Sequence, residues 1–185
     1  MSYSESQRKQ LIKLARDSIA WGLDHARPLD VSVREYDEEL QRKAACFVTL
    51  HKNGELRGCI GSLEAHRPLV EDVSENAFAA AFRDPRFFAL QDDEFDQLSL
   101  SISVLTPAQP MQFSSEQDLI AQLRPGVDGL ILQEGYHRGT FLPSVWEQLP
   151  DPHQFLQHLK MKAGLSPDHW SDQIEVSRYQ TESFE

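Results

Sequence analysis

The pair Asn53-Gly54, set between two stretches of strand-forming residues, constrains the fold of this chain more than any other sequence feature. A two-residue type I′ turn requires positive φ angles at both central positions, and Asn and Gly adopt such angles more readily than other residues. The pair therefore predicts a tight β-hairpin whose strands run over residues 46–52 and 55–61.

The length of this turn fixes how the two strands pair. Counting outward from the turn pairs Lys52 with Glu55, Leu50 with Arg57 and Val48 with Cys59. Because side chains alternate along a strand, Arg57 and Cys59 would share one face, and Gly58 and Ile60 would share the other. Cys46 would lie diagonally from Cys59 on the same face. A disulfide between the two would be strained there, so we expect two free thiols.

Periodic apolar residues predict the remaining elements. The spacing indicates helices over residues 6–22, 68–83, 116–124 and 152–163, a strand over 98–105 and a last strand over 174–184. A second hairpin would join residues 130–133 to 136–142 through a turn at Glu134-Gly135. Hairpins mixed with helices, without regular alternation of the two, indicate an α+β fold with mainly antiparallel sheets.

The strand over residues 98–105 alternates between apolar residues and serines, which is typical of a half-buried strand. Its serine face would either be solvated or line a polar cleft. Antiparallel sheets commonly expose one face to water, which favours the first interpretation.

The charge of the chain argues against several classes of partner. The net charge is −11, from 29 acidic and 18 basic side chains, and the acidic residues are dispersed. Nucleic-acid binding and attachment to anionic membranes both need a basic patch, and the sequence contains none. We therefore expect neither nucleic acid nor membrane among the partners of this protein.

Metal, cofactor and membrane motifs are also missing from the sequence. The two cysteines do not form a CxxC pair, and no histidines have the spacing of metal ligands. The first ten residues are polar, and no apolar run approaches the roughly 18 residues of a membrane span. We expect a cytoplasmic protein with reduced thiols and predict no cofactor and no metal.

Cys59 is the candidate nucleophile of the chain. Arg57 on the same predicted face would stabilise a thiolate, and a catalytic thiol also needs a base. The histidines that could serve are His51, His66 and His137. Cysteine is, however, among the most frequently buried residue types, which favours a structural role for Cys59 in the absence of other observations.

Two further arginines, Arg86 and Arg138, could bind an anion. Arg86 follows Asp84 closely, so a local ion pair at a helix end is the alternative for it. Arg138 would share a strand face with Tyr136 and Thr140. This polar row would be either a binding surface or an exposed hairpin face.

Residues 56–61, Leu-Arg-Gly-Cys-Ile-Gly, resemble the signature of the AMMECR family. Other stretches of the chain resemble that family in the same order, which makes chance similarity a poor explanation. These stretches are Asp84 to Phe87, Leu98 to Pro107, Asp128 to Leu130, Gly139 to Pro143 and Leu159 to Leu165.

The resemblance implies one AMMECR-like domain over residues 1–185, with an α+β fold of two unequal lobes. Each lobe would be a mainly antiparallel sheet with flanking helices. The larger lobe would hold both termini, the smaller lobe would come from the middle of the chain, and the signature would face a cleft between them. The resemblance also implies a Memo-like protein and a radical SAM protein as partners, but no known activity.

Two hypotheses of function follow. In the first, the protein binds, and in its stronger form modifies, a small molecule or peptide in the cleft. Arg57 would anchor an anionic group, Cys59 would act as nucleophile or thiol acceptor, and Gly58 and Gly61 would open the backbone to the ligand. The secondary ligand contacts would be Arg86, Tyr136, Arg138 and Thr140. In the second hypothesis the chain is a noncatalytic adaptor for its protein partners.

Overall fold

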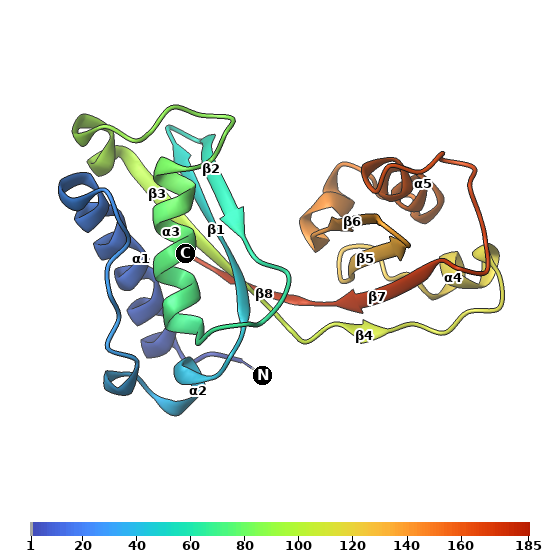
Figure 1. Cartoon of the computed structure of the whole chain (residues 1–185), viewed down its shortest axis with the longest axis horizontal. Helices are drawn as coiled ribbons and strands as arrows, with labels where there is room; N and C mark the ends of the chain where they lie inside the picture. Colours follow the sequence, from blue (N-terminus) through green and yellow to red (C-terminus); the bar gives the residue numbers. More distant parts are fainter. Residues whose placement is uncertain (1) are drawn as a thin grey trace. The chain divides into compact units, whose positions relative to one another are not determined.

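The computed structural model describes residues 2–185 and divides into two compact units. Unit 1 comprises the chain up to Leu105 together with Glu182–Glu185, and unit 2 comprises Thr106–Thr181. Each unit contains one four-stranded sheet, and helices flank both sheets (Figure 1). The predicted α+β class with mainly antiparallel sheets is confirmed.

Unit 1 has its two long helices, α1 (Glu5–His25) and α3 (Leu69–Phe82), packed side by side on one face of a sheet (Figure 1). The strand order is β2-β1-β3-β8. These strands are β1 (Ala45–Lys52), β2 (Glu55–Gly61), β3 (Leu98–Leu105) and β8 (Thr181–Phe184). The shorter elements are η1 (Val33–Glu35), α2 (Glu38–Gln41) and η2 (Asp92–Gln97).

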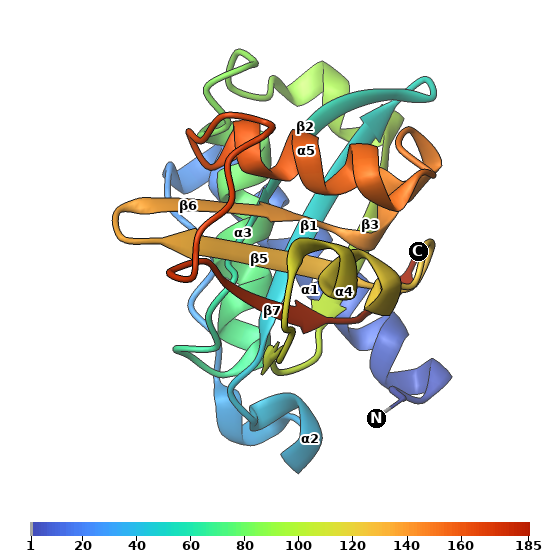
Figure 2. The same cartoon turned by 90° about the vertical axis from the view of Figure 1, so that its right-hand side faces the viewer.

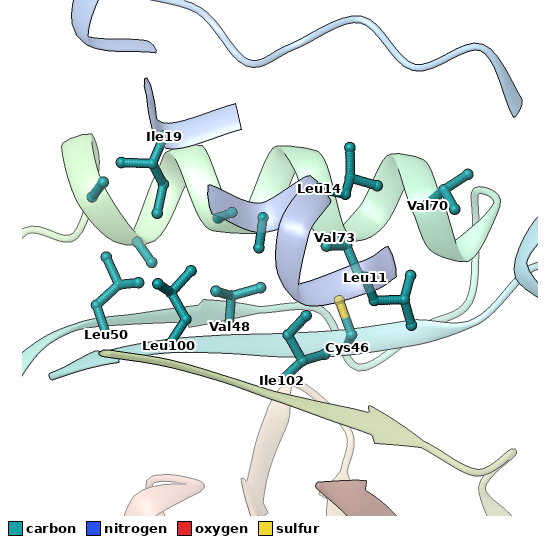
Figure 3. Close-up of a cluster of buried hydrophobic side chains, with 14 of the residues drawn as sticks. Leu11, Leu14, Ile19, Cys46, Val48, Leu50, Val70, Val73, Leu100 and Ile102 are labelled. Carbon is teal, nitrogen blue, oxygen red and sulfur yellow. The ribbon is translucent and has the colours of Figure 1, made fainter. Parts of the chain in front are cut away.

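The core of unit 1 lies between this helix pair and the sheet. Figure 3 shows apolar side chains of the two helices meeting those of β1 and β3. Helix α1 begins with a capping box, in which Ser4 accepts from the Gln7 amide and the Gln7 side chain accepts from the Ser4 amide. Gly22 lets the helices approach closely, because a Cβ there would lie 2.6 Å from the rings of Phe78 and Phe82.

A fully buried carboxylate, Asp72 of α3, joins this helix to the sheet. Asp72 accepts hydrogen bonds from the Cys46 amide at 2.9 Å and the Asn76 side chain at 3.0 Å. It also accepts from the Ser62 hydroxyl at 2.9 Å, just beyond the end of β2, and from Arg67 at 2.7 Å. A buried charge is tolerated when it is this fully paired.

The hairpin of β1 and β2 has the predicted strands and turn but a different register. Asn53 and Gly54 have φ angles of 53° and 81°, and Lys52 pairs with Glu55 as expected. Beyond the next pair a β-bulge at Arg57 shifts the register. The observed pairs are therefore Leu50 with Gly58 and Thr49 with Cys59.

This bulge changes which residues of β1 share a face with those of β2, because a one-residue shift moves side chains to the opposite face of a sheet. Gly58 and Ile60 still share one face of their strand, as predicted, opposite Leu50 and Val48. Cys46 points into the core beside the helices (Figure 3), whereas Cys59 lies opposite Thr49 on the other face. The prediction that the two cysteines share a face was wrong. Both are free thiols, as predicted.

Unit 2 has a sheet of order β4-β7-β5-β6, of which Figure 2 shows β7, β5 and β6 side by side. The strands are β4 (Gln109–Pro110), β5 (Gly129–Glu134), β6 (His137–Phe141) and β7 (Glu175–Tyr179), and the helices are α4 (Glu116–Gln122), η3 (Pro143–Glu147) and α5 (Pro152–Lys162). Its core is separate from that of unit 1. At its centre Trp146 stacks on Phe155 with ring centroids 3.7 Å apart.

Two predictions for the second half of the chain were wrong in detail. The second hairpin turns at Gly135-Tyr136, one residue later than predicted, so Glu134 pairs with His137. Gly135 has a φ of 58°, and a glycine at the first central position suits a type II′ turn. The terminal stretch forms two strands, β7 and β8, which belong to different sheets.

Candidate functional site

The signature strand β2 lies at the edge of the unit 1 sheet, and its glycines are required by packing within the protein. A Cβ at Gly58 would overlap the backbone carbonyl oxygen of Ala80 in α3. A Cβ at Gly61 would overlap the ring of Phe47 and lie 2.6 Å from the Cys46 carbonyl oxygen. The protein's own atoms thus occupy the close approaches that glycine permits. The predicted ligand contacts of Gly58 and Gly61 stay predictions.

Cys59 belongs to a row of polar side chains on the sheet face away from the helices. Its Sγ lies 3.2 Å from the Thr49 hydroxyl, and Thr49 pairs with Cys59 on one side and with Ser101 on the other. A thiol and two hydroxyls are therefore neighbours across three strands. The serine face of β3 forms part of this row. Thr49 was not predicted to belong to it, because the predicted register paired Cys59 with Val48 instead of Thr49.

His51 is the histidine that shares this face with Cys59. It lies two residues beyond Thr49 on β1, which makes it a diagonal neighbour of Cys59. Diagonal neighbours are about 7–8 Å apart at Cα, within reach of long side chains. The Nδ1 atoms of the other candidates contact carbonyl oxygens, that of Glu64 for His66 and that of Ala163 for His137. An Nδ1 contact of this kind does not prevent Nε2 from acting as a base. His51 is the predicted base that lies on the same sheet face as Cys59, and its role stays a prediction.

The backbone of Cys59 is held by an ion pair from the segment after α3. Asp84 accepts the Cys59 N–H at 3.0 Å, and Arg86 donates to the Cys59 carbonyl at 3.4 Å. Arg86 also donates to both carboxylate oxygens of Asp84, at 3.0 and 2.7 Å. These two side chains satisfy backbone groups that an edge strand would otherwise offer to another strand.

This pairing changes the interpretation of Arg86. Hydrogen bonds from Arg86, together with those from the amides of Cys59 and Arg86, hold the pKa of Asp84 well below its usual range, although burial opposes the shift. The local ion pair considered from the sequence is present. The hydrogen bond from the Cys59 amide to Asp84 was not predictable, because Asp84 lies 25 positions after Cys59. Binding of a ligand anion by Arg86 stays a prediction.

Arg57 is paired within the chain. Its Nε and Nη2 donate to the two carboxylate oxygens of Glu94 at 3.0 and 3.1 Å, and its Nη2 donates to the Phe88 carbonyl at 2.8 Å. The guanidinium also lies over the ring of Phe87, 5.8 Å from its centroid. Lys52 adds a third bond to Glu94 at 3.1 Å. The carboxylate that the Arg57 fork suits is thus supplied by the protein itself.

Glu94 responds strongly to this environment. Hydrogen bonds from Arg57, the Gln91 amide and Lys52 lower its pKa to about 2, against the opposing effect of burial. The remaining nitrogen of Arg57, Nη1, is buried and has no hydrogen-bond partner among the residues that the structure describes. The role of Arg57 as an anchor for a ligand anion stays a prediction.

The other three predicted contacts lie in unit 2. Tyr136 is fully exposed in the turn between β5 and β6, and Arg138 and Thr140 lie on β6. The Thr140 hydroxyl donates to the Leu130 carbonyl at 2.8 Å and lies 3.1 Å from the Tyr179 hydroxyl. Burial raises the pKa of Tyr179 to about 12. Of the predicted polar row, Thr140 is therefore engaged inside its own unit.

Over residues 2–185 no group of three His, Cys, Asp or Glu side chains is arranged to hold a metal ion. In the same range no helix has both the length and the apolar character needed to cross a membrane.

Comparison with known proteins identifies the family. The sequence model of the AMMECR1 family matches residues 12–184. The chain belongs to the AMMECR1 family. The resemblance inferred from residues 56–61 is thereby confirmed.

Relatives of the chain match it over most of their length. A protein of Methanothermobacter thermautotrophicus is 39% identical over 183 residues, covering 98% of this chain and 95% of the relative. A protein of Saccharolobus solfataricus is also 39% identical, and the match covers 95% of this chain and 80% of the relative. The crystal structure of an uncharacterised protein of Pyrococcus horikoshii superposes with a TM-score of 0.89 at 32% identity, covering 97% of this chain and 91% of that one.

Proposed function

We propose that this AMMECR1-family protein binds a small molecule or peptide on the polar sheet face of unit 1, with the Cys59 thiol as its reactive contact. The observation that carries the proposal is the fixed position of a partly exposed thiol. Asp84 and Arg86 hold the Cys59 backbone, and Thr49 lies 3.2 Å from Sγ. Functional groups are commonly held in this way by neighbours that fix their orientation.

The groups beside Cys59 suit acyl transfer to the thiol. His51 would take the thiol proton while the sulfur forms a bond to a carbonyl carbon of the ligand. The bond from that carbon to its oxygen, nitrogen or sulfur leaving group would break, and His51 would return the proton to the leaving group. Thr49 and Ser101 would donate hydrogen bonds to the carbonyl oxygen. A Memo-like protein and a radical SAM protein would supply or consume the transferred group.

The test is the rate of acylation of Cys59 in a Cys46→Ser background. S-phenyl thioacetate serves as the probe, and the +acetyl product is followed by intact-mass spectrometry between pH 5 and 9. We expect His51→Gln to slow the reaction by about tenfold or more and to flatten its pH dependence, because a general base contributes at least this much. Thr49→Val should also slow it, at an unchanged unfolding temperature.

Ser99→Ala is the matched control, since it alters an exposed hydroxyl opposite His51 on the same face. It should react as the parent does. If all variants react at the rate of a short cysteine peptide, Cys59 is a structural thiol and the proposal fails.

A second candidate function is that of a noncatalytic adaptor. It is favoured by the packing of the signature itself, because Arg57, Gly58 and Gly61 are all engaged by the protein's own atoms. On this proposal residues 56–61 build a rigid surface for a partner such as the Memo-like protein. Co-elution with that partner would then survive Cys59→Ser, whereas a thiol-dependent function would be lost.

A further inference from the structure

A pocket of about 480 Å³ opens in unit 1 where α1 and α3 end. Both helices finish at the same end of the unit, and the segment that follows α3 passes across that end (Figure 1). The larger and charged side chains that line the pocket include Leu23, Phe78, Phe82, Arg83, Leu90 and Asp92. Its volume falls within the range of about 300–1,000 Å³ that is usual for ligand pockets.

Asp92 and Arg83 are the charged residues that line this pocket, and most of the charged residues next to it in the sequence are acidic. The C-terminal end of a helix carries partial negative charge, and two such ends meet here. Asp24 lies in the last turn of α1, where an acidic residue is unfavourable for the helix itself, and Asp92 lines the pocket. Asp93 and Asp96 follow on the same segment, exposed and without an ion pair among residues 2–185. The basic side chains at this end are Arg83, which lies over the Phe78 ring at 4.9 Å, Arg27, which pairs with Asp30 at 2.9 Å, and His25 in the last turn of α1.

The residue that precedes the pocket wall in the sequence has an exposed aromatic side chain. Phe88 is 95% exposed and directly precedes the wall residues Ala89 to Asp92. Its backbone is nevertheless fixed, because the Phe88 carbonyl accepts from Arg57 at 2.8 Å and the Leu90 amide donates to the Ala81 carbonyl at 2.9 Å. A phenyl group presented on a fixed backbone loses little conformational freedom when it is covered.

We propose that this pocket and Phe88 bind a segment of a partner protein that carries a lysine or arginine beside an apolar side chain. The cation would lie near Asp92 and the helix ends, and the apolar side chain would pack against Phe78 and Phe82. Phe88 would be covered at the centre of the contact, as aromatic anchors of interfaces commonly are. A second copy of this chain fits poorly, because two chains of net charge −11 repel each other.

This inference rests on the adaptor function and is independent of the chemistry of Cys59. One variant therefore distinguishes binding at this pocket from the chemistry of Cys59. Cys59→Ser should leave binding at this pocket unchanged, whatever its effect on acylation.

The test is selection of peptides from a random 12-residue phage library on the immobilised full chain. We expect enriched peptides with net positive charge and at least one aromatic or branched aliphatic residue. One such peptide is then synthesised with a fluorescent label, and its binding is measured by anisotropy. Phe88→Ala and Asp92→Asn should each weaken it by about tenfold or more, as loss of a central interface residue does. Added salt should weaken it as well.

Met161→Ala and Asp172→Asn are the matched controls, since they change an exposed apolar side chain and an exposed carboxylate of unit 2. Both should bind the peptide as the parent does. The side chain of Phe88 is exposed, so its removal should leave the unfolding temperature unchanged. Failure to enrich basic peptides, equal weakening by the controls, or full binding by Phe88→Ala would each overturn the proposal.

Discussion

The two cysteines show how strongly the surroundings of one residue decide what it can do. Cys46 is completely buried, and burial together with the nearby Asp72 carboxylate raises the pKa of its thiol well above the ordinary value. Cys59 is partly exposed on the opposite face of the same sheet. Only a thiol that reagents can reach is able to react, so Cys59 should react with thiol reagents much faster than Cys46 in the folded protein.

We therefore predict that 5,5′-dithiobis(2-nitrobenzoate) modifies one thiol per folded chain and two after unfolding in guanidinium chloride. Cys59→Ser should abolish the fast reaction, and Cys46→Ser should leave it unchanged. Absorbance of the released thiolate gives the stoichiometry. Rapid modification of both thiols in the native protein would contradict the burial of Cys46.

Gly58 is a residue whose importance lies in the absence of a side chain. We expect Gly58→Ala to lower the free energy of unfolding by about 1–3 kcal/mol, because the added Cβ overlaps the Ala80 carbonyl and α3 must shift. Urea denaturation followed by circular dichroism measures the change. Glu55→Ala, at an exposed position of the same strand, is the control and should change the stability by less than about 0.5 kcal/mol. Equal stability of Gly58→Ala and the parent would show that strand and helix are not closely packed here.

At the scale of elements, Arg57 joins the bulge in β2 to the segment between α3 and β3. Arg57, Lys52 and the Gln91 amide all donate to Glu94, whose side chain is 16% exposed. The folded state therefore stabilises the ionised carboxylate of Glu94 more than the unfolded state does. The pKa falls from 4.5 to about 2, which makes this contribution to stability dependent on pH.

We predict that Glu94→Gln lowers the free energy of unfolding by about 1.5–3 kcal/mol at pH 7, the range for hydrogen bonds to charged groups. Because the folded pKa is depressed, the stabilisation is fully present above the ordinary value of 4.5 and is lost as the pH falls toward 2. The difference between parent and variant should therefore shrink between pH 5 and pH 2.5. Urea denaturation at several pH values measures it, with Glu175→Gln as an exposed control.

A difference that stays constant down to pH 2.5 would contradict the depressed pKa of Glu94. A difference near zero at pH 7 would mean that the ion pair with Arg57 contributes nothing to stability.

The same elements show what could be inferred from the sequence and why the rest could not. Asn53-Gly54 predicted the ends of β1 and β2 because turn geometry is local, and the serine alternation predicted β3 residue by residue. The bulge at Arg57 was missed because no nearby residue marks it, although it decides the face on which Cys59 lies. The partners of Cys59 and Arg57 were missed because Asp84 and Glu94 lie 25 and 37 residues away. A pattern of alternating residues likewise does not reveal that β7 and β8 belong to different sheets.

At the scale of the whole molecule, the chain builds two cores from unequal parts. The core of unit 1 needs β8 from the C-terminus as well as the first 105 residues, so this unit is discontinuous in sequence. Unit 2 is one continuous segment with its own buried cluster. The main members of that cluster are Leu119, Leu130, Leu132, Trp146, Phe155, Leu156, Leu159 and Val176.

We predict that the isolated segment Thr106–Thr181 folds on its own, because its sheet, its helices and the core between them lie within that range. Its amide NMR spectrum should be dispersed and should match the corresponding signals of the full chain for the buried strands β5 and β7. Unfolding should be cooperative by Trp fluorescence, since Trp146 is 3% exposed and stacks on Phe155. Trp146→Ala should lower the free energy of unfolding by about 3–5 kcal/mol, which would leave so small a unit unfolded. Val127→Ala, at an exposed position, is the control and should fold normally. A collapsed but poorly dispersed spectrum for the parent segment would show that unit 2 depends on the rest of the chain to form its core.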